Sequence, residues 1–147
     1  MNQNAGRIRL NVVEGAFTRD TDFFSKMDPY CIIKCREQTF KTKVKQNAGK
    51  KPYWDEYFDI EVKYVGDDLT ITVLDEDLTS SDLVAETTIK LTALCHNQGI
   101  DDWFGVQYKG KSAGKIHLKS QFFPAQIQGM GIQPGQAGYG MQQAIGM

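Results

Sequence analysis

The chain has 147 residues, which corresponds to one domain with a short extension. Its hydrophobic content of 41% and charged content of 24% are ordinary for a soluble globular protein. The net charge of −1 gives no indication of nucleic-acid binding. No stretch approaches the roughly 18 consecutive apolar residues of a membrane-spanning helix, and residues 1–6 lack the apolar segment of a signal peptide.

Alternation of apolar and polar residues, the period of a half-buried β-strand, runs through most of the chain. It predicts strands at 7–12, 31–36, 40–45, 58–63 and 69–74, and further candidate strands at 87–91, 103–108 and 115–121. The segment 92–98 fits either a short helix or a loop. Eight short strands in about 115 residues predict an all-β fold, an eight-stranded antiparallel β-sandwich.

Three cysteines are present. Cys31 and Cys35 are four residues apart on an expected strand, so their Cα atoms should lie about 13 Å apart, too far for a disulfide. Reduced thiols favour a cytoplasmic location.

The composition changes near the C-terminus. The last 23 residues contain six Gly, six Gln and no charged residue. We therefore divide the chain into an N-terminal arm (1–5), the sandwich (6–123) and a Gln/Gly/Met-rich low-complexity tail (124–147). The tail has two interpretations: a flexible extension, or a segment that becomes ordered on a protein partner.

Five aspartates stand out in two of the expected loops. Asp22 and Asp28 lie between the first two strands, and Asp75, Asp77 and Asp82 follow the fifth. Five carboxylates at one end of a sandwich would repel one another unless a cation lay among them. Flexible oxygen ligands of this kind suit Ca²⁺ better than Mg²⁺, which requires a stricter octahedron. The alternative is that these aspartates only cap turns.

Three motifs carry a resemblance to C2 domains. They are Asp22-x5-Asp28-Pro29-Tyr30, the sequence K-P-Y-W-D-E-Y-F at 51–58, and D-E-D-L-T-S-S-D at 75–82. They resemble, in order and spacing, the first calcium loop of the family, its N-P-x-W-N-E-x-F stretch and its third calcium loop. The resemblance covers residues 6–123 and implies a Greek-key sandwich with type II-like topology.

The resemblance also implies a calcium-binding function. Residue by residue, all five aspartates match the five carboxylate positions of the family's calcium site. The sequence departs from the family at Lys51, where Asn is usual, and at 84–86, where a Gly is usual soon after the last Asp. Phe23 and Phe24 replace the small residues of the first loop. The departure at 84–86 affects the exit of the third loop and leaves the ligands intact.

Two lipid-contacting surfaces are expected, the first of them from the resemblance. The expected basic face, which engages phosphoinositide headgroups in the family, has five members: Lys34, Arg36, Lys41, Lys43 and Lys45. A solvated sheet face is the alternative. Exposed Phe23, Phe24 and Leu78 would enter the membrane interface once calcium neutralises the aspartates. One of the two phenylalanines could instead plug the end of the sandwich.

Other functions find less support. His96 and His117 are the only histidines, and neither lies in a nucleophile motif, so we predict no enzyme activity. Residues 105–112 match the phosphate-loop spacing, but their strand context indicates a hairpin turn. An EF-hand at 75–86 lacks its glycine, because Ser80 occupies that position.

The sequence therefore predicts a Ca²⁺-dependent, non-catalytic module that docks on anionic phospholipid membranes as a cytoplasmic, peripheral membrane protein. The alternative is a calcium-indifferent protein-interaction module that uses the sandwich and residues 124–147.

Overall fold

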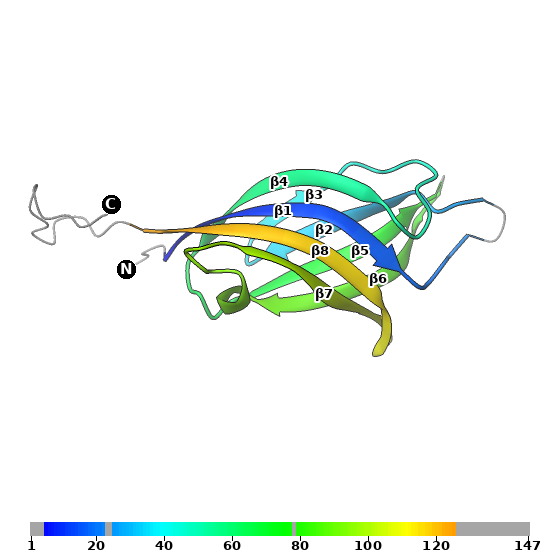
Figure 1. Ribbon diagram of the computed structural model, residues 1–147. Coiled ribbons are helices and arrows are strands. Elements are labelled where there is room, and N and C mark those ends of the chain that lie inside the picture. Colours follow the sequence, from blue (N-terminus) through cyan, green and yellow to red (C-terminus); the bar gives the residue numbers. More distant parts are fainter. Residues whose placement is uncertain (1–4, 23–24, 78, 126–147) are drawn as a thin grey trace, which may run out of the picture.

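The computed structural model describes residues 5–22, 25–77 and 79–125 (Figure 1). This part of the chain forms eight antiparallel strands and one short 3-10 helix. The strands are β1 (Gly6–Phe17), β2 (Pro29–Cys35), β3 (Gln38–Lys41), β4 (Tyr53–Val62), β5 (Asp68–Glu76), β6 (Ser81–Lys90), β7 (Ile100–Tyr108) and β8 (Lys111–Pro124). The 3-10 helix spans Leu91–Ala93, so the undecided segment 92–98 is mainly a loop.

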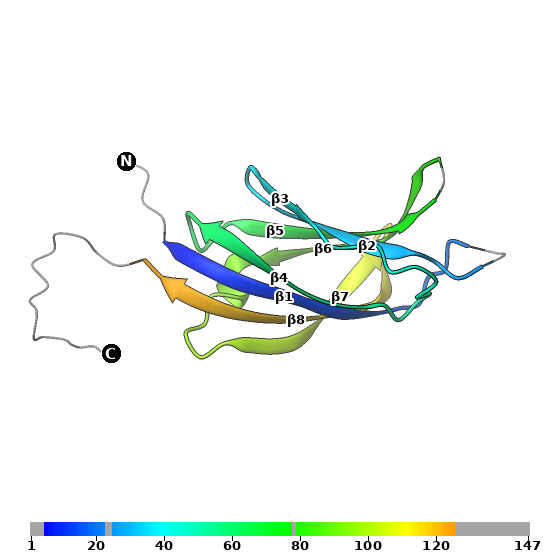
Figure 2. The same cartoon turned by 90° about the horizontal axis from the view of Figure 1, so that it is seen from above.

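The strands form two layers, β3-β2-β5-β6 and β7-β8-β1-β4 (Figure 2). One registered pair, Glu86 with Gln107, joins β6 to β7 and makes the hydrogen-bonded order continuous from β3 to β4. The predicted all-β sandwich is therefore confirmed.

The core lies between the layers and follows from the alternation. Ile8, Leu10 and Val12 of β1 have no exposed surface, whereas the alternating Arg7 and Arg9 are exposed; Asn11 departs from the pattern, because it is 3% exposed. Each fully buried Leu or Ile contributes about 1.5–3 kcal/mol relative to an exposed position. The same pattern in the facing strands closes the core, for example at Ile33, Ile71, Val73, Ile116 and Leu118.

The start of β1 and the end of β8 lie side by side, because Gly6 pairs with Pro124. The loop between β1 and β2 and the β5–β6 turn lie at the opposite end of the molecule (Figure 1). The two expected aspartate loops therefore lie together, at the end of the sandwich opposite Gly6 and Pro124.

The strand expected at 40–45 is shorter in the structure, since β3 ends at Lys41. The hydroxyl of Thr42, which is buried, accepts the main-chain N–H of Cys31 at 2.8 Å. The Cys31 N–H therefore donates to a side-chain hydroxyl, and not to a main-chain carbonyl as in a regular strand pair, so the ladder ends here. Lys43 and Lys45 consequently follow β3 in a loop, although the Lys45 N–H still donates to the carbonyl of Pro29 at 3.0 Å.

Arg36 was expected to project from a strand beside Lys34, and this prediction is wrong. β2 ends at Cys35, and Arg36 adopts a left-handed backbone conformation with φ of 53° in the following turn. Its guanidinium forms an ion pair with Asp67. Arg36 is therefore tied to a neighbouring loop, and only the lysines remain in the expected basic set.

The phosphate-loop match at 105–112 is a hairpin, as the sequence analysis expected. Tyr108 pairs with Lys111, and the two intervening residues, Lys109 and Gly110, both have positive φ, 51° and 79°. Two positive φ values define the turn that matches the twist of a two-residue β-hairpin.

A bulge in β1 creates a polar cluster on the outer face of its layer. The register shift between Val12 and Glu14 places Glu14 opposite His117. The ring nitrogens of His117 lie 2.8 Å from Glu14 Oε2 and 2.6 Å from Asp101 Oδ1, and only an imidazolium donates from both. Burial acts to lower the pKa of His117, but the hydrogen bonds to Asp101 and Glu14 outweigh it, so the pKa is raised.

No helix of the described residues has the length and hydropathy needed to cross a membrane. All three cysteines are free thiols: Cys31 and Cys35 are buried, and Cys95 is half-buried. Burial raises the pKa of Cys95 to about 11, with a further contribution from Cys35, so this thiol is a poor nucleophile at neutral pH.

Candidate functional site: the acidic end of the sandwich

The candidate site is built from three connections at one end of the molecule. They are residues 18–28 between β1 and β2, residues 42–52 between β3 and β4, and the turn between β5 and β6. Phe23, Phe24 and Leu78 belong to these connections in sequence but lie outside the described residues.

Asp75 is the most buried carboxylate of the group, with 4% of its surface exposed. It ends the alternating run of β5 and pairs with Pro29 on one side and with Asp82 on the other. Its Oδ1 accepts the main-chain N–H of Asp28 at 2.8 Å, and its Oδ2 accepts the hydroxyl of Thr21 at 2.7 Å. Among the described residues, no ion pair includes Asp75.

Asp28 lies directly beside Asp75 and is held by a third connection. Its Oδ1 accepts the main-chain N–H of Asn47 at 2.6 Å, and its carbonyl accepts the N–H of Glu76 at 3.0 Å. Asn47 has a φ of 57°, a conformation that Asn tolerates better than most residues. Asp28 thus links the β1–β2 loop, the β3–β4 loop and the end of β5.

The remaining three aspartates are placed differently. Asp22 accepts the N–H and the hydroxyl of Ser25 at 3.1 and 2.7 Å, which closes a turn within its own loop. Asp77 opens the β5–β6 turn, where its N–H donates to the carbonyl of Ser80 at 2.8 Å. Asp82 lies on β6 and is exposed.

The structure brings Asp28, Asp75 and Asp82 to adjacent strand ends by register. Within the described residues, however, no three His, Cys, Asp or Glu side chains are close enough to hold a metal ion. Carboxylate oxygens are the ligand type that a hard cation prefers, and the most buried of these aspartates, Asp75, has Asp28 and Asp82 as neighbours.

All three sequence motifs meet at the base of this site. The indole N–H of Trp54, from the motif at 51–58, donates to the carbonyl of Pro29 at 3.2 Å. The hydroxyls of Tyr30 and Ser81 lie 2.8 Å apart. These bonds fasten the start of β2 to β4 and β6, so they set the positions from which the loops leave.

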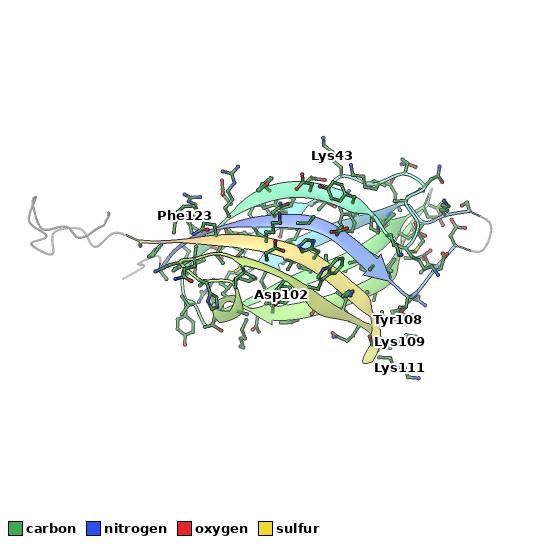
Figure 3. The ribbon with its side chains drawn as sticks, in the orientation of Figure 1. Lys43, Asp102, Tyr108, Lys109, Lys111 and Phe123 are labelled. Atoms are coloured by element: carbon green, nitrogen blue, oxygen red, sulfur yellow. The ribbon has the colours of Figure 1, made fainter. Side chains whose placement is uncertain are left out.

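A cleft of about 490 Å³ adjoins Asp82. Arg19 lines it, with its guanidinium carbon 3.5 Å from the centroid of the Tyr108 ring and two of its nitrogens donating to the carbonyl of Leu83 at 3.3 Å. Lys109, at the tip of the β7–β8 hairpin, lines the same cleft. Figure 3 shows Tyr108, Lys109 and Lys111 together at that tip.

The expected basic face divides into two groups. Lys34 and Lys41 lie on the outer face of the β3–β2 pair, since Lys34 pairs with Thr39 and Lys41 with Ile32. The ammonium group of Lys41 lies 4.6 Å from the centroid of the Tyr30 ring. Lys43 and Lys45 follow in the loop toward β4, and Figure 3 shows Lys43 on that edge of the molecule.

Sequence reasoning missed several contributors to the site. Thr21 and Asn47 supply direct hydrogen bonds to Asp75 and Asp28, and the Oδ1 of Asp20 accepts the N–H of Asp22 at 2.9 Å. The adjacency of Thr21 to Asp22, and the turn-forming sequence Asn47-Ala48-Gly49, were the available signals.

The fold and this end together define an antiparallel β-sandwich with an acidic loop cluster. Residues 6–106 match the family model of the C2 domain. The chain therefore belongs to the C2 domain family.

Relatives and solved structures agree with this assignment. The chain is 30% identical over 129 residues to elicitor-responsive protein 3 of Oryza sativa subsp. japonica, covering 86% of this chain and 90% of that protein. It superposes on a C2 domain-containing protein from a putative elicitor-responsive gene with a TM-score of 0.70 and 29% identity, covering 84% and 93% of the two chains. A calcium-bound pair of C2 domains from extended synaptotagmin 2 matches with a TM-score of 0.74 and 25% identity, covering 84% and 48%.

Proposed function

We propose that this C2 domain is a calcium-dependent, non-catalytic module that docks on anionic phospholipid membranes. Asp22, Asp28, Asp75, Asp77 and Asp82 would hold the ion. The similarity to extended synaptotagmin 2 supports the proposal, since that pair of C2 domains is calcium-bound.

The environment of Asp75 carries the proposal. A carboxylate with 4% of its surface exposed has acidic neighbours and no ion pair among the described residues. Removing a carboxylate from water without a compensating charge is costly. Two hydrogen-bond donors offset part of that cost, and a cation at this end would offset the rest.

Bound calcium would supply positive charge and further coordination positions for lipid phosphate oxygens. The chain itself supplies three contributions around it. The aspartates set the charge of the end, the proposed membrane-contacting residues Phe23, Phe24 and Leu78 add apolar surface, and the cleft beside Asp82 offers Lys109 to an anionic headgroup.

The lysines would add a salt-dependent attraction. Each cation near an anionic membrane contributes about 1 kcal/mol, and the effect falls within a Debye length. Lys34, Lys41, Lys43 and Lys45 form the proposed basic face, without Arg36, whose charge is paired with Asp67. We place the protein at the membrane periphery on this basis.

Co-sedimentation with phosphatidylserine-containing vesicles, in calcium and in chelator, tests the proposal. We expect retention only with calcium. Replacing Lys41, Lys43 and Lys45 by Ala should weaken binding mainly at low salt.

A matched control replaces Lys63, Lys115 and Lys119, which lie in neither the β3–β4 connection nor the β7–β8 hairpin tip, and changes the net charge equally. If this control weakens vesicle binding as much as the replacement of Lys41, Lys43 and Lys45 does, the loss of binding comes from net charge and not from the basic face. If the wild-type protein does not bind vesicles even in calcium, the calcium-indifferent protein-interaction module becomes the better description, with residues 124–147 as the segment to truncate.

A further inference from the structure

The β7-β8-β1-β4 layer faces the viewer in Figure 1. Its outer face carries a hollow, whereas Lys34 and Lys41 belong to the other layer. Asn11 of β1 pairs with Tyr57 of β4 and with Lys119 of β8, and Lys119 pairs with Asp101 of β7. Cross-strand partners in antiparallel sheets point to the same face, so these four side chains form one row across the layer. A cavity of about 350 Å³ lies over this row.

Asn11 contributes to the cavity lining, although only 3% of its surface is exposed. Its Nδ2 donates to Asp55 Oδ1 at 3.0 Å. This bond fixes the orientation of the amide, because a flipped amide would place two acceptors together. Among the described residues, the Oδ1 of Asn11 is buried without a hydrogen-bond partner. Because this oxygen is buried beneath the cavity lining, a ligand in the cavity meets the neighbouring side chains and not the Asn11 acceptor.

The walls of the cavity carry both donors and acceptors. The guanidinium carbon of Arg9 lies 5.1 Å from the centroid of the Tyr57 ring, which steadies its planar donor group. Lys119 provides a second cation, and Asp101 an acceptor that His117 holds at 2.6 Å. The two cations outnumber the one carboxylate in the lining, so the cavity favours a ligand with an anionic group.

This arrangement selects a class of ligand. Hydroxyl groups both donate and accept, so a polyol pairs with the Asp101 carboxylate and with the cationic donors Arg9 and Lys119. A single carboxylate or phosphate pairs with Arg9 and Lys119. The cavity is near the lower end of the size range of small-molecule sites, which suits one sugar ring.

We propose that this hollow binds a monosaccharide-sized polyol that carries one carboxylate or phosphate group. The site goes beyond the proposed membrane docking and requires neither calcium nor the aspartate loops. Its failure and the failure of calcium-dependent docking are therefore distinguishable when the binding assay contains a chelator.

Heteronuclear NMR titration of the full chain in chelator tests the proposal, with glucuronate and glucose-6-phosphate as the two charged probes. We expect the side-chain amide of Asn11 and the main-chain amide of Lys119 to shift with either probe. Glucose has the sugar ring without the charge, and inorganic phosphate has the charge without the ring. Each should bind roughly tenfold more weakly than the charged sugar. The charged probe that binds more tightly identifies the anionic group.

Variants locate the site. Lys119→Ala should weaken binding of the tighter probe roughly tenfold, since one charged hydrogen bond is lost. Lys111→Ala removes an exposed lysine from the same strand outside the cavity and should leave binding unchanged. The absence of Asn11 shifts at millimolar probe, equal binding of inorganic phosphate and the sugar phosphate, or equal weakening by the two lysine variants would each overturn the proposal.

Discussion

Replacing Asp75 by Asn separates a structural role of this carboxylate from a role as a calcium ligand. Without calcium, the Asn carbonyl oxygen can accept the N–H of Asp28, and the Thr21 hydroxyl can rotate to accept from the Asn amide. We therefore expect Asp75→Asn to change the free energy of unfolding in chelator by less than about 1 kcal/mol. Asp75→Ala leaves the Asp28 N–H without a partner and should cost about 1–3 kcal/mol.

Calcium changes the comparison. At a calcium concentration of about 100 Kd, binding to the folded state alone stabilises the wild-type protein by about 2.7 kcal/mol. For a domain of this size, that corresponds to a rise in Tm of about 10 °C. Because an amide supplies a neutral and weaker ligand, the Asp75→Asn variant should lose most of this rise.

Thermal unfolding followed by circular dichroism, in calcium and in chelator, measures these differences for the wild type, Asp75→Asn and Asp75→Ala. The reasoning fails if Asp75→Asn retains the full calcium-induced shift, or if it is destabilised in chelator as much as Asp75→Ala. The first outcome removes Asp75 from the ligand set. The second makes its role structural.

Two further predictions concern the sandwich itself. Gly114→Ala should destabilise the fold by more than about 3 kcal/mol in urea titration, because φ is +117° and the new Cβ would lie 2.2 Å from a β1 carbonyl oxygen. Gly110→Ala, at φ +79° with nothing within 4 Å, should cost only about 1 kcal/mol, and equal losses would contradict this account. The pKa of His117 is higher in the folded protein than in the unfolded chain, where it is about 6.5, so the imidazolium stabilises the fold. This stabilisation is fully present below the unfolded pKa and should disappear as the pH rises through the folded pKa. His117→Gln should flatten the pH dependence of Tm in that window; an unchanged profile would show that Glu14 and Asp101 do not retain the imidazolium.

The alternation of side chains determined most of the fold from sequence alone. In β1, Ile8, Leu10 and Val12 can be buried together only on one face of a strand, so their spacing specifies both the element and its core side. The same local rule located β2, β4 and β5. The turn at Lys109–Gly110 was also readable, because the surrounding strand pattern excludes the helix that a phosphate loop requires.

The limits of β3 and β2 were decided by contacts between distant residues. Thr42 ends the ladder because its hydroxyl meets the N–H of Cys31, and alternation cannot report such a side-chain acceptor. Arg36 leaves the expected face because Asp67, 31 residues away, is within reach of its guanidinium. Neither partner is visible in a local pattern.

In the candidate site, too, the sequence identified some features and only the tertiary structure decided others. The sequence identified five aspartates in two loops, because their spacing follows the ends of strands. Only the tertiary structure decided that Asp75 is buried against the N–H of Asp28, while Asp22 bonds to Ser25 in its own loop. The burial of the Asn11 amide likewise depends on the register of three neighbouring strands. Strand formation follows from local alternation, but the partners of a polar side chain depend on which strands and loops the chain brings together.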